Sequence, residues 1–205
     1  RTTQPPKAAP IAINTTSKLT EADHIKAATI LGVETAAIKA IAEVESRGSG
    51  FLCSGKPKIL FEGHWFSTFT QGKFDQGNPT ISYKKWVKNF YLGNEKEYTR
   101  LNAALALDKE AALKSTSWGK FQIMGFNYKH CGYGTVEDFV KDMHKSESFH
   151  LLAFVKLMKS MKWDVDVRAK NWAGFAKKYN GPGYKSNAYD VKLKQAYDAY
   201  SGAIK

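Results

Sequence analysis

A glutamate at the end of an apolar helical stretch is the feature that most constrains how this chain folds. Residues 33 to 44 are almost all aliphatic or helix-forming, and Gly48 and Gly50 follow, which predicts a helix that these glycines stop. With about 100° of rotation per residue, Glu45 lies about 20° from Ile38, on the apolar side of that helix. We therefore expect the Glu45 carboxyl group to lie where the helix enters the core.

The neighbouring acid Glu43 is expected to have a different environment. It is rotated about 160° from Glu45 and shares the opposite side of the helix with Lys39, so we expect it to be solvated. Glu45 loses hydration instead, and we expect burial to raise its pKa so that it holds a proton near neutral pH. From this stretch alone two interpretations stay open, a catalytic acid or a buried acid paired with a structural Arg or Lys.

The composition indicates one folded domain with a short arm. Of the 205 residues, 43% are hydrophobic and 13% aromatic, which is typical of a packed globular protein and excludes a disordered one. Residues 1–18 are polar, basic and proline-bearing, which predicts a flexible N-terminal arm or linker remnant before a main domain at 19–205. No apolar run approaches 18 residues, so we expect no membrane-spanning helix.

The net charge of +12 points to a polyanionic partner. Nucleic acid, anionic lipid and anionic cell-wall polymer all fit this charge. From residue 156 onward the chain has ten Lys and one Arg against four Asp, so about +7 of the +12 lies in this last quarter.

The two cysteines, Cys53 and Cys131, do not form a CxxC pair, and neither has a pair of histidines nearby. They therefore make a poor metal site, and we expect buried free thiols, as in a reducing cytoplasm. The five histidines do not follow an HExxH or facial-triad spacing, and His144 and His150 should point in different directions on a helix. No metal site is expected.

The pattern of helix formers and caps predicts a mostly helical chain with one small β region. Thr20 and Asp23 resemble a capping box that opens a helix towards Leu31. A strand is expected within 56–66, with a short return strand at 80–82. Further helices are expected at 83–92, 95–107 with Asn94 as the cap, 135–144, 147–161, 166–179 and 186–201. Strands and helices do not alternate regularly, which is typical of an α+β fold.

Four short segments form a recognisable set. They are Val44-Glu45-Ser46-x-Gly48-x-Gly50-Phe51, Pro57-Lys58-Ile59-Leu60-Phe61-Glu62-x-His64, Ser117-Trp118-Gly119-x-Phe121-Gln122-Ile123-Met124-Gly125 and Tyr179-Asn180-Gly181-Pro182-Gly183-Tyr184. In this order they resemble the N-acetylmuramidase domain of phage and prophage endolysins, and share motifs with goose-type lysozymes and soluble lytic transglycosylases. The resemblance covers about residues 20 to 201. It implies an α+β lysozyme-like fold, mostly helical, with one small antiparallel β region beside the active-site cleft.

The resemblance assigns the catalytic acid to Glu45. This residue would protonate the glycosidic oxygen between N-acetylmuramic acid and N-acetylglucosamine, and a half-buried helix end suits an acid that must stay protonated. Glu62 would stand in the same cleft, either as a base that positions the attacking water or as a structural partner across the cleft. The other acids, Asp75 in a polar loop and Asp108 at a helix end, are expected to be solvated.

The resemblance also implies five substrate-binding residues. Tyr179 and Asn180 would line the sugar cleft and support the catalytic glutamate, although Asn before Gly is also a common helix C-cap. The amide of Gln122 suits an N-acetyl group because it both donates and accepts hydrogen bonds. Ser117 and Gly119 would allow the backbone to approach a sugar closely.

Two other functions fit part of the sequence. A lytic transglycosylase uses the same glutamate but replaces water with the muramic acid 6-hydroxyl and leaves a 1,6-anhydro product; the segment containing Glu62 favours hydrolysis. A basic module that only binds nucleic acid or wall polymer explains the charge and the aromatic content. It does not explain a glutamate on an apolar helix face.

The resemblance implies peptidoglycan as the partner, with neither a cofactor nor a nucleic acid, and a monomeric enzyme. It also implies synthesis in the host cytoplasm without a signal peptide and action on the cell wall in the periplasm. The stretch 156–163 mixes lysines with Leu157, Met158 and Met161 at helical spacing. Either these three pack on the core while the lysines are solvated, or the cationic C-terminal face also contacts anionic lipopolysaccharide or membrane.

Overall fold

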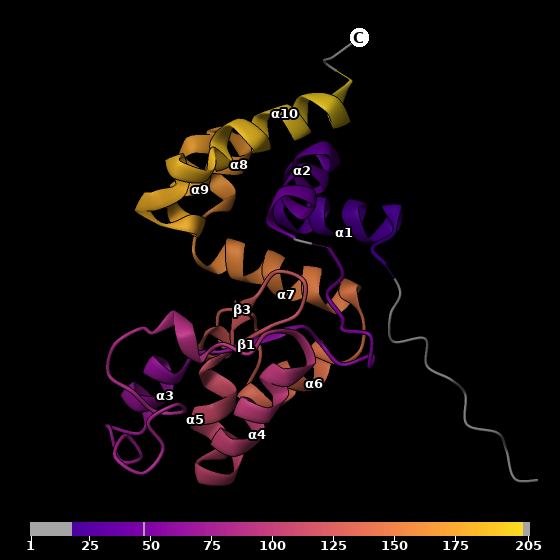
Figure 1. Ribbon diagram of the computed structural model, residues 1–205. Coiled ribbons are helices and arrows are strands. Elements are labelled where there is room, and N and C mark those ends of the chain that lie inside the picture. The colour runs from indigo at the N-terminus through magenta and orange to yellow at the C-terminus, as the bar shows by residue number, and fades with distance from the viewer. Residues whose placement is uncertain (1–17, 47, 203–205) are drawn as a thin grey trace, which may run out of the picture.

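The computed structural model describes residues 18–46 and 48–202, and it shows two groups of helices with a central helix between them (Figure 1). The upper group in Figure 1 contains α1 Glu21–Leu31, α2 Thr35–Glu45, α8 Asp164–Arg168, α9 Trp172–Asn180 and α10 Tyr189–Ser201. The lower group contains α3 Gly63–Phe69, α4 Glu97–Leu107, α5 Lys109–Lys114 and α6 Val136–Met143. The central helix is α7 Glu147–Ser160. Short 3-10 helices are η1 Lys88–Phe90, η2 Asn94–Lys96, η3 Gly125–Asn127 and η4 Pro182–Asn187.

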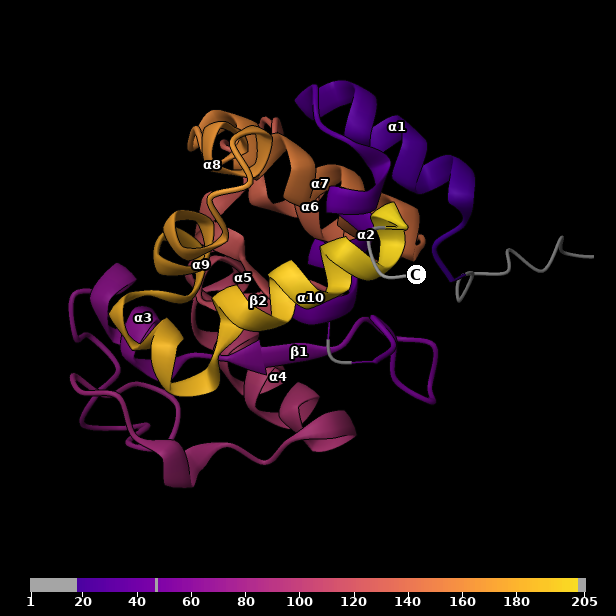
Figure 2. The same ribbon diagram turned by 90° about the horizontal axis from the view of Figure 1, so that it is seen from above.

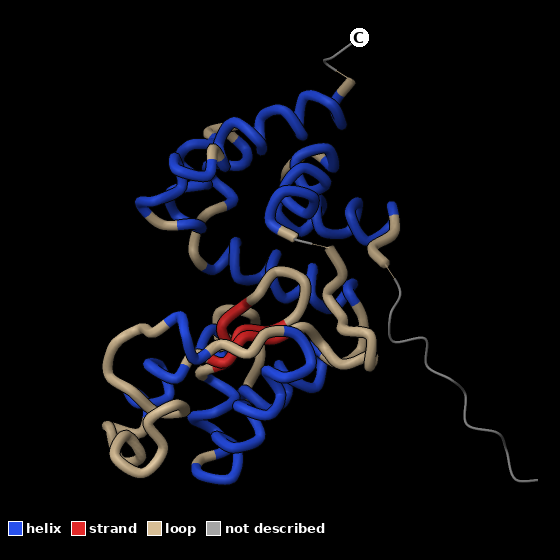
Figure 3. Tube along the Cα trace, viewed as in Figure 1, coloured by secondary structure: helices blue, strands red, loops and turns tan. Residues whose placement is uncertain are grey.

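A small antiparallel sheet lies under the central helix in this view (Figure 3). Its strands are β1 Ile59–Phe61, β2 Thr116–Trp118 and β3 Ile123–Met124, in that order across the sheet. Ile59 pairs with Trp118, which pairs with Ile123, and these three side chains are buried in the core. Because side chains alternate along a strand, the neighbouring row of Leu60, Ser117 and Met124 faces the other way. The expected α+β fold with one small antiparallel β region is confirmed.

Helix α2 ends at the site described below, and two other helices of the upper group cover it. Helices α10 and α1 both contact α2, and Figure 2 shows α10 running across it. Ile38 and Ile41 of α2 are almost completely buried, as the apolar pattern predicts. The central helix joins the two groups, since Phe154 of α7 stacks on Phe121 beside the sheet at a centroid distance of 4.6 Å.

A buried ion pair on α4 holds the end of β1 and the segment 80–93 together. Glu97 accepts hydrogen bonds from the backbone N–H groups of Leu92 (3.0 Å) and Gly93 (3.1 Å). Its partner Arg100 donates to the carbonyl oxygens of Phe61 (2.8 Å) and Thr80 (3.1 Å). A buried ion pair needs such additional bonds to offset the loss of hydration, and here the bonds fix the wall of the later site.

These bonds explain why two predictions for this segment are wrong. Residues 83–92 do not form a helix apart from η1, and 80–82 form a turn instead of a strand. The side chains of Glu97 and Arg100 form hydrogen bonds with backbone N–H and C=O groups of this segment. A helix or a strand would need these groups for its own hydrogen bonds. The strand expected within 56–66 is also shorter, because α3 begins at Gly63, where a Cβ atom would lie 2.3 Å from the Tyr83 ring.

Two helix predictions need correction at their ends. The helix expected at 95–107 begins at Glu97, after η2, and the Asn94 side chain does not cap it. The unpredicted helix α5 follows, capped by exposed Asp108, whose Oδ1 accepts from the Ala111 N–H at 2.9 Å. The solvated position expected for Asp108 is confirmed, whereas Asp75 is partly buried and accepts bonds from the hydroxyls of Ser67 and Ser82.

The helix expected at 166–179 is two helices. They are α8 and α9, separated where Lys170 adopts a left-handed φ of 55° and Asn171 caps α9 by accepting from the Gly174 N–H at 3.1 Å. The capping box at Thr20 and Asp23 is confirmed, as are the helices α1, α2, α6 and α7.

The structure also bears on the predictions for the cysteines, for the segment 156–163 and for membrane-spanning helices. Cys53 and Cys131 are both free thiols, but only Cys131 is buried, and burial raises its pKa to about 12. Leu157 and Met158 pack in the core, whereas Met161 is 42% exposed, so the expected packing of the segment is wrong for Met161. Within 18–46 and 48–202, the structure contains no helix with the length and apolar character needed to cross a bilayer. Residues 1–17 of the expected arm lie outside the described part of the chain.

Candidate active site

Glu45 is the last residue of α2 and is half-buried. The helix ends before the two glycines, because Ser46 adopts an extended conformation as the C-cap and its hydroxyl donates to the Ala42 carbonyl. Glu43 is exposed, as predicted, and accepts a hydrogen bond from the Tyr200 hydroxyl at 2.6 Å. The two acids of this helix therefore lie in the two different environments that their spacing predicts.

Glu45 opens into a groove of about 680 Å³ between the helices and the sheet. The lining residues come from α2, β1 and the residue before it, the segment before α4, the turn before β3, and the ends of α9 and α10. They are Val44, Glu45, Lys58, Ile59, Leu60, Gly93, Asn94, Phe121, Gln122, Tyr179, Asn180 and Tyr189. Four of the residues predicted from the sequence motifs, Glu45, Gln122, Tyr179 and Asn180, thus meet in one groove although they lie far apart in the chain. A groove of this size accommodates part of an extended ligand.

Asn180 contacts Glu45 directly. Its side-chain Nδ2 donates to Glu45 Oε1 at 3.1 Å, while Gly181, with a φ of 75°, is the C-cap of α9. Asn180 is therefore not the C-cap of α9, and its side chain contacts Glu45 instead. The Asn180 amide is a neutral donor, so this bond orients the Glu45 carboxyl group without adding a charge.

Tyr179 forms the floor next to this contact. Its hydroxyl donates to the Phe121 carbonyl at 3.0 Å, and its ring packs against Phe154 and Phe175. Burial raises the pKa of Tyr179, and the negative charge of Glu45 raises it further. The phenol therefore stays neutral, and it gives the groove an apolar wall beside the carboxyl group.

Gln122 joins the residue before β1 to the hairpin of β2 and β3 at the groove. Its Nε2 donates to the carbonyl oxygens of Lys58 (3.1 Å) and Gly119 (2.8 Å), and its Oε1 accepts from the Ser117 hydroxyl at 2.9 Å. Both amide hydrogens are therefore used inside the protein. This geometry differs from the expectation that the Gln122 amide donates to an N-acetyl group.

Ser117 and Gly119 lie behind Gln122. Ser117 is buried, and Gly119 has a φ of 72° with the position of its missing Cβ only 2.8 Å from the His150 ring. Glycine is needed here because of the imidazole. The structure thus places these two residues where they hold Gln122, rather than where they would let the backbone approach a sugar.

Glu62 continues the face of β1 that lines the groove. It lies two residues beyond Leu60, on the same side of the chain, about 7 Å further along. The Tyr91 hydroxyl donates to Glu62 Oε2, and His64 Nδ1 lies 3.4 Å from the same oxygen. Burial raises the pKa of Tyr91, and its bond to Glu62 adds to this, so Tyr91 remains a proton donor to the carboxylate.

A buried polar cluster on α7 holds the two loops on either side of the site. Glu147 Oε1 accepts from the Gly50 N–H at 2.7 Å, in the loop that follows Glu45. Lys120 Nζ lies 3.2 Å from Glu147 and donates to the Gly48 carbonyl at 2.8 Å. A loop tied at Gly48 and Gly50 fixes the position of the adjacent end of α2.

His150 completes this cluster from the next turn of α7. Its Nδ1 accepts from the Lys120 N–H at 3.0 Å, and its Nε2 donates to the Met143 carbonyl at 2.7 Å. Phe51 stacks on the ring at a centroid distance of 4.9 Å. Burial lowers the pKa of His150 to about 4, and this bonding pattern requires the neutral imidazole. His144 is exposed, so the two histidines do point in different directions, as predicted.

Sequence reasoning did not find this cluster or Tyr91. Glu147 follows Ser146 at a helix start, where an acidic residue is common on the surface, so the sequence does not indicate its burial. Tyr91 lies in the segment wrongly expected to be a helix. The pairing with Glu62 depends on the long-range bonds made by Glu97 and Arg100.

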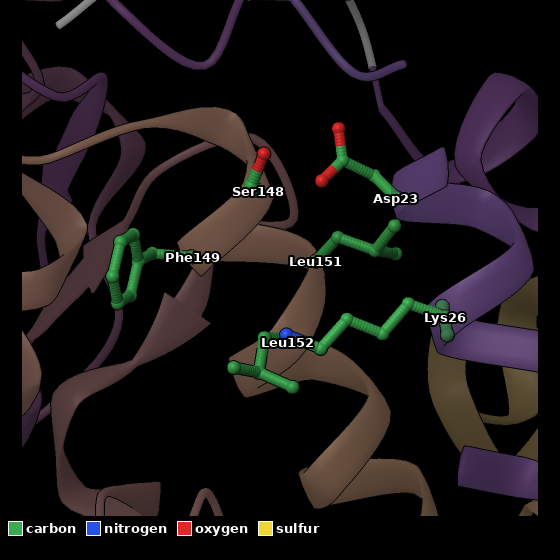
Figure 4. Close-up of a pocket in the computed structure, with 7 residues that line it drawn as sticks. Asp23, Lys26, Ser148, Phe149, Leu151 and Leu152 are labelled. Carbon is green, nitrogen blue, oxygen red and sulfur yellow. The ribbon is translucent and has the colours of Figure 1, made fainter. Parts of the chain in front are cut away.

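Two other hollows do not contain the predicted site. The smaller, of about 100 Å³, lies between α1 and α7, where Figure 4 shows Asp23 and Lys26 facing Leu151 and Leu152. The larger, of about 760 Å³, lies on the opposite side of the end of α2 and is lined by charged side chains. Two pairs of these side chains form ion pairs, Lys39 with Glu21 at 2.6 Å and Lys120 with Glu147. Because a carboxylate paired with a lysine is held in its charged form, this hollow is less suited to proton transfer.

Comparisons with known proteins show the family to which the chain belongs. The family model described as "Muramidase: N-acetylmuramidase" matches residues 34–201. The crystal structure of a Burkholderia AP3 phage endolysin is similar with a TM-score of 0.85 and 43% sequence identity, over 89% of this chain and 71% of that chain. No match was found among curated proteins. The family match spans the groove and most of the chain, and the chain therefore belongs to the N-acetylmuramidase family, glycoside hydrolases that degrade peptidoglycan.

Proposed function

We propose that the enzyme hydrolyses the β-1,4 bond between N-acetylmuramic acid and N-acetylglucosamine, with Glu45 as the general acid. The position of Glu45 carries this proposal. It is half-buried at a helix end, lines the groove, and is oriented by the Asn180 amide. A carboxyl group beside an apolar wall such as Tyr179 is poised to hold a proton until a leaving group takes it.

The proposed reaction follows from this placement. A glycan strand lies in the groove, Glu45 donates its proton to the bridging oxygen, and the bond from that oxygen to the anomeric carbon of N-acetylmuramic acid breaks. Positive charge then develops on the sugar ring. Water attacks the anomeric carbon and releases a proton to bulk water, from which the Glu45 carboxylate is protonated again. The products are a reducing end and a new 4-hydroxyl group.

We propose that Glu62 supports the groove wall and is not the base. Its carboxylate accepts the Tyr91 hydroxyl and lies against His64, so its hydrogen-bonding capacity is directed towards the protein. It also lies beyond the residues that line the groove at Glu45. The carboxylate thereby ties β1 to the segment that contains Gly93 and Asn94.

Exchange of Glu62 for Gln tests this assignment. We expect Glu62→Gln to lower kcat on purified peptidoglycan less than about tenfold, because a general base contributes about 10²–10⁴-fold. The matched variant Tyr91→Phe breaks the same bond from the other side, so it should produce a similar change. A loss of 100-fold or more in Glu62→Gln alone would instead identify Glu62 as the base.

We also propose that the protein is an endolysin that acts on the cell wall. The similar solved structure is that of a phage endolysin, and the net charge of +12 favours approach to an anionic wall. Contact of the cationic C-terminal face with lipopolysaccharide or membrane stays a prediction. On that face, Lys159 donates to the Ile30 carbonyl at 3.0 Å and Lys156 lies over the Tyr133 ring.

A further inference from the structure

Trp86 is the most exposed large apolar side chain in the described part of the chain, at 58%. Tryptophan is usually well buried, because its ring system is large and mostly apolar. Trp86 lies just before η1, in a segment that the Glu97 and Arg100 bonds hold in place. Its exposure therefore occurs on a segment whose two ends are bonded to α4.

The Trp86 indole packs against the ring of Tyr91. Trp86 meets Tyr91 edge to face at a centroid distance of 6.3 Å. Tyr91 in turn donates to Glu62. An indole that packs against Tyr91 and is still 58% exposed presents much of its apolar ring surface to solvent.

This ring lies next to the groove. Two residues after Tyr91, Gly93 and Asn94 line the groove, and Glu62 follows Leu60 along the same face of β1. In Figure 3 the tan stretch between η1 and α4 crosses in front of the red strands. Trp86 therefore stands beyond the end of the groove wall, on the side of Glu62.

Three lysines lie within two residues of Trp86 in the chain. Lys84, Lys85 and Lys88 are all exposed, and none of the three has a carboxylate partner within 18–46 and 48–202. Exposed lysines on the same short segment as an exposed aromatic ring fit a ligand with both apolar surface and negative charge. Peptidoglycan has both features, the C–H faces of its sugar rings and the carboxylates of its peptides.

We propose that Trp86 is a secondary glycan subsite, on which a sugar ring of the same strand stacks, remote from the bond cleaved at Glu45, while the lysines bind the peptide carboxylates. This inference rests on the proposed function for its substrate class. The polarised C–H groups of a sugar face meet the negative face of the indole, and the contact removes apolar surface from water. The subsite holds polymeric substrate and does not alter the chemical step.

Binding without turnover tests the subsite separately from catalysis. In a Glu45→Gln background, co-sedimentation with insoluble purified peptidoglycan should show that Trp86→Ala raises the half-saturating concentration about fivefold. Trp86→Phe should keep most of the affinity, since it keeps an aromatic face. The matched control Ile25→Ala removes an apolar side chain that is 50% exposed on α1 and should not change binding. An unchanged affinity in Trp86→Ala would overturn the proposal, whatever the role of Glu45.

The peptide carboxylates are tested with two forms of the wall. A triple change of Lys84, Lys85 and Lys88 to Gln should weaken binding to intact peptidoglycan and make it less sensitive to salt. On glycan strands stripped of peptides by an amidase, the triple variant should bind as the parent does, while Trp86→Ala should still bind weakly. Equal weakening of the triple variant on both substrates would overturn the assignment of the lysines to peptide carboxylates.

KM and kcat on long and short substrates distinguish a binding subsite from a residue that only supports the fold. In the active enzyme, Trp86→Ala should raise KM on polymeric peptidoglycan with kcat unchanged, and should leave both constants unchanged on a short soluble glycan fragment. A fall in kcat on both substrates would show damage to the groove, and would contradict a remote subsite.

Discussion

Glu45→Gln is expected to lower the rate of peptidoglycan hydrolysis by about 10³-fold while the protein stays folded. Glutamine keeps the shape of the side chain and its partner Asn180, but it has no proton to donate to the glycosidic oxygen. Because the residue lies at a helix end and is only half-buried, the free energy of unfolding should change by less than about 1 kcal/mol. The rate of release of soluble fragments and a urea unfolding curve measure the two effects.

Glu43→Gln is the matched control for this prediction. It removes an acid two residues earlier on the same helix, where the side chain is exposed and bonded to Tyr200. Its activity should stay within about twofold of the parent, as for an exposed surface change. A Glu45→Gln enzyme that keeps more than a tenth of the parent rate, or a Glu43→Gln enzyme with the larger loss, would remove Glu45 from the mechanism.

When the pH falls from 7.5 to 4.5, the His150→Gln variant is expected to lose about 2.5 kcal/mol less of its free energy of unfolding than the parent does. Burial lowers the pKa of His150 from its ordinary 6.5 to about 4 in the folded protein. Between these values the unfolded chain binds the proton and the folded protein does not. The contribution is therefore fully present above pH 6.5 and is lost as the pH falls towards 4.

Like neutral histidine, glutamine has one acceptor for the Lys120 N–H and a donor for the Met143 carbonyl, but it does not bind a proton in this pH range. Urea unfolding at the two pH values should therefore show a smaller loss of stability in the variant than in the parent. His144→Gln, on an exposed histidine six residues earlier, should behave as the parent does. Equal pH dependence in His150→Gln and the parent would show that His150 is not held neutral by the fold.

The part of the site that local sequence pattern determines could be predicted. The helical spacing of Ile38 and Ile41 places Glu45 on the inner side of α2, and Glu43 outside, as the structure shows. The motif that contains Tyr179 and Asn180 reaches the groove because it ends α9, which the helix signals locate to within a few residues. The family match over residues 34–201 agrees with the resemblance of the motifs.

What the sequence did not predict depends on long-range polar contacts. Residues 83–92 have a helical pattern, yet the side chains of Glu97 and Arg100 bind the backbone on both sides of the segment and prevent the helix. The same bonds set Tyr91 against Glu62 and leave Trp86 exposed. Local propensity does not contain this information, because the partners come from a different element.

Gln122 shows the same limit on a smaller scale. Its motif places it in the groove, but its bonds to Lys58, Ser117 and Gly119 depend on the sheet register and on a left-handed φ of 47°. A motif gives the identity of a residue and its approximate place. Which of its hydrogen-bonding groups remain available is determined only by the folded surroundings.

Mass spectrometry of the soluble products from purified peptidoglycan, before and after borohydride reduction, tests the central claim most directly. Hydrolysis leaves a reducing N-acetylmuramic acid end, so each fragment should gain the mass of two hydrogens on reduction. Fragments that end in 1,6-anhydro-muramic acid would not be reduced. They would contradict attack by water and identify a lytic transglycosylase that uses Glu45 without a hydrolytic base.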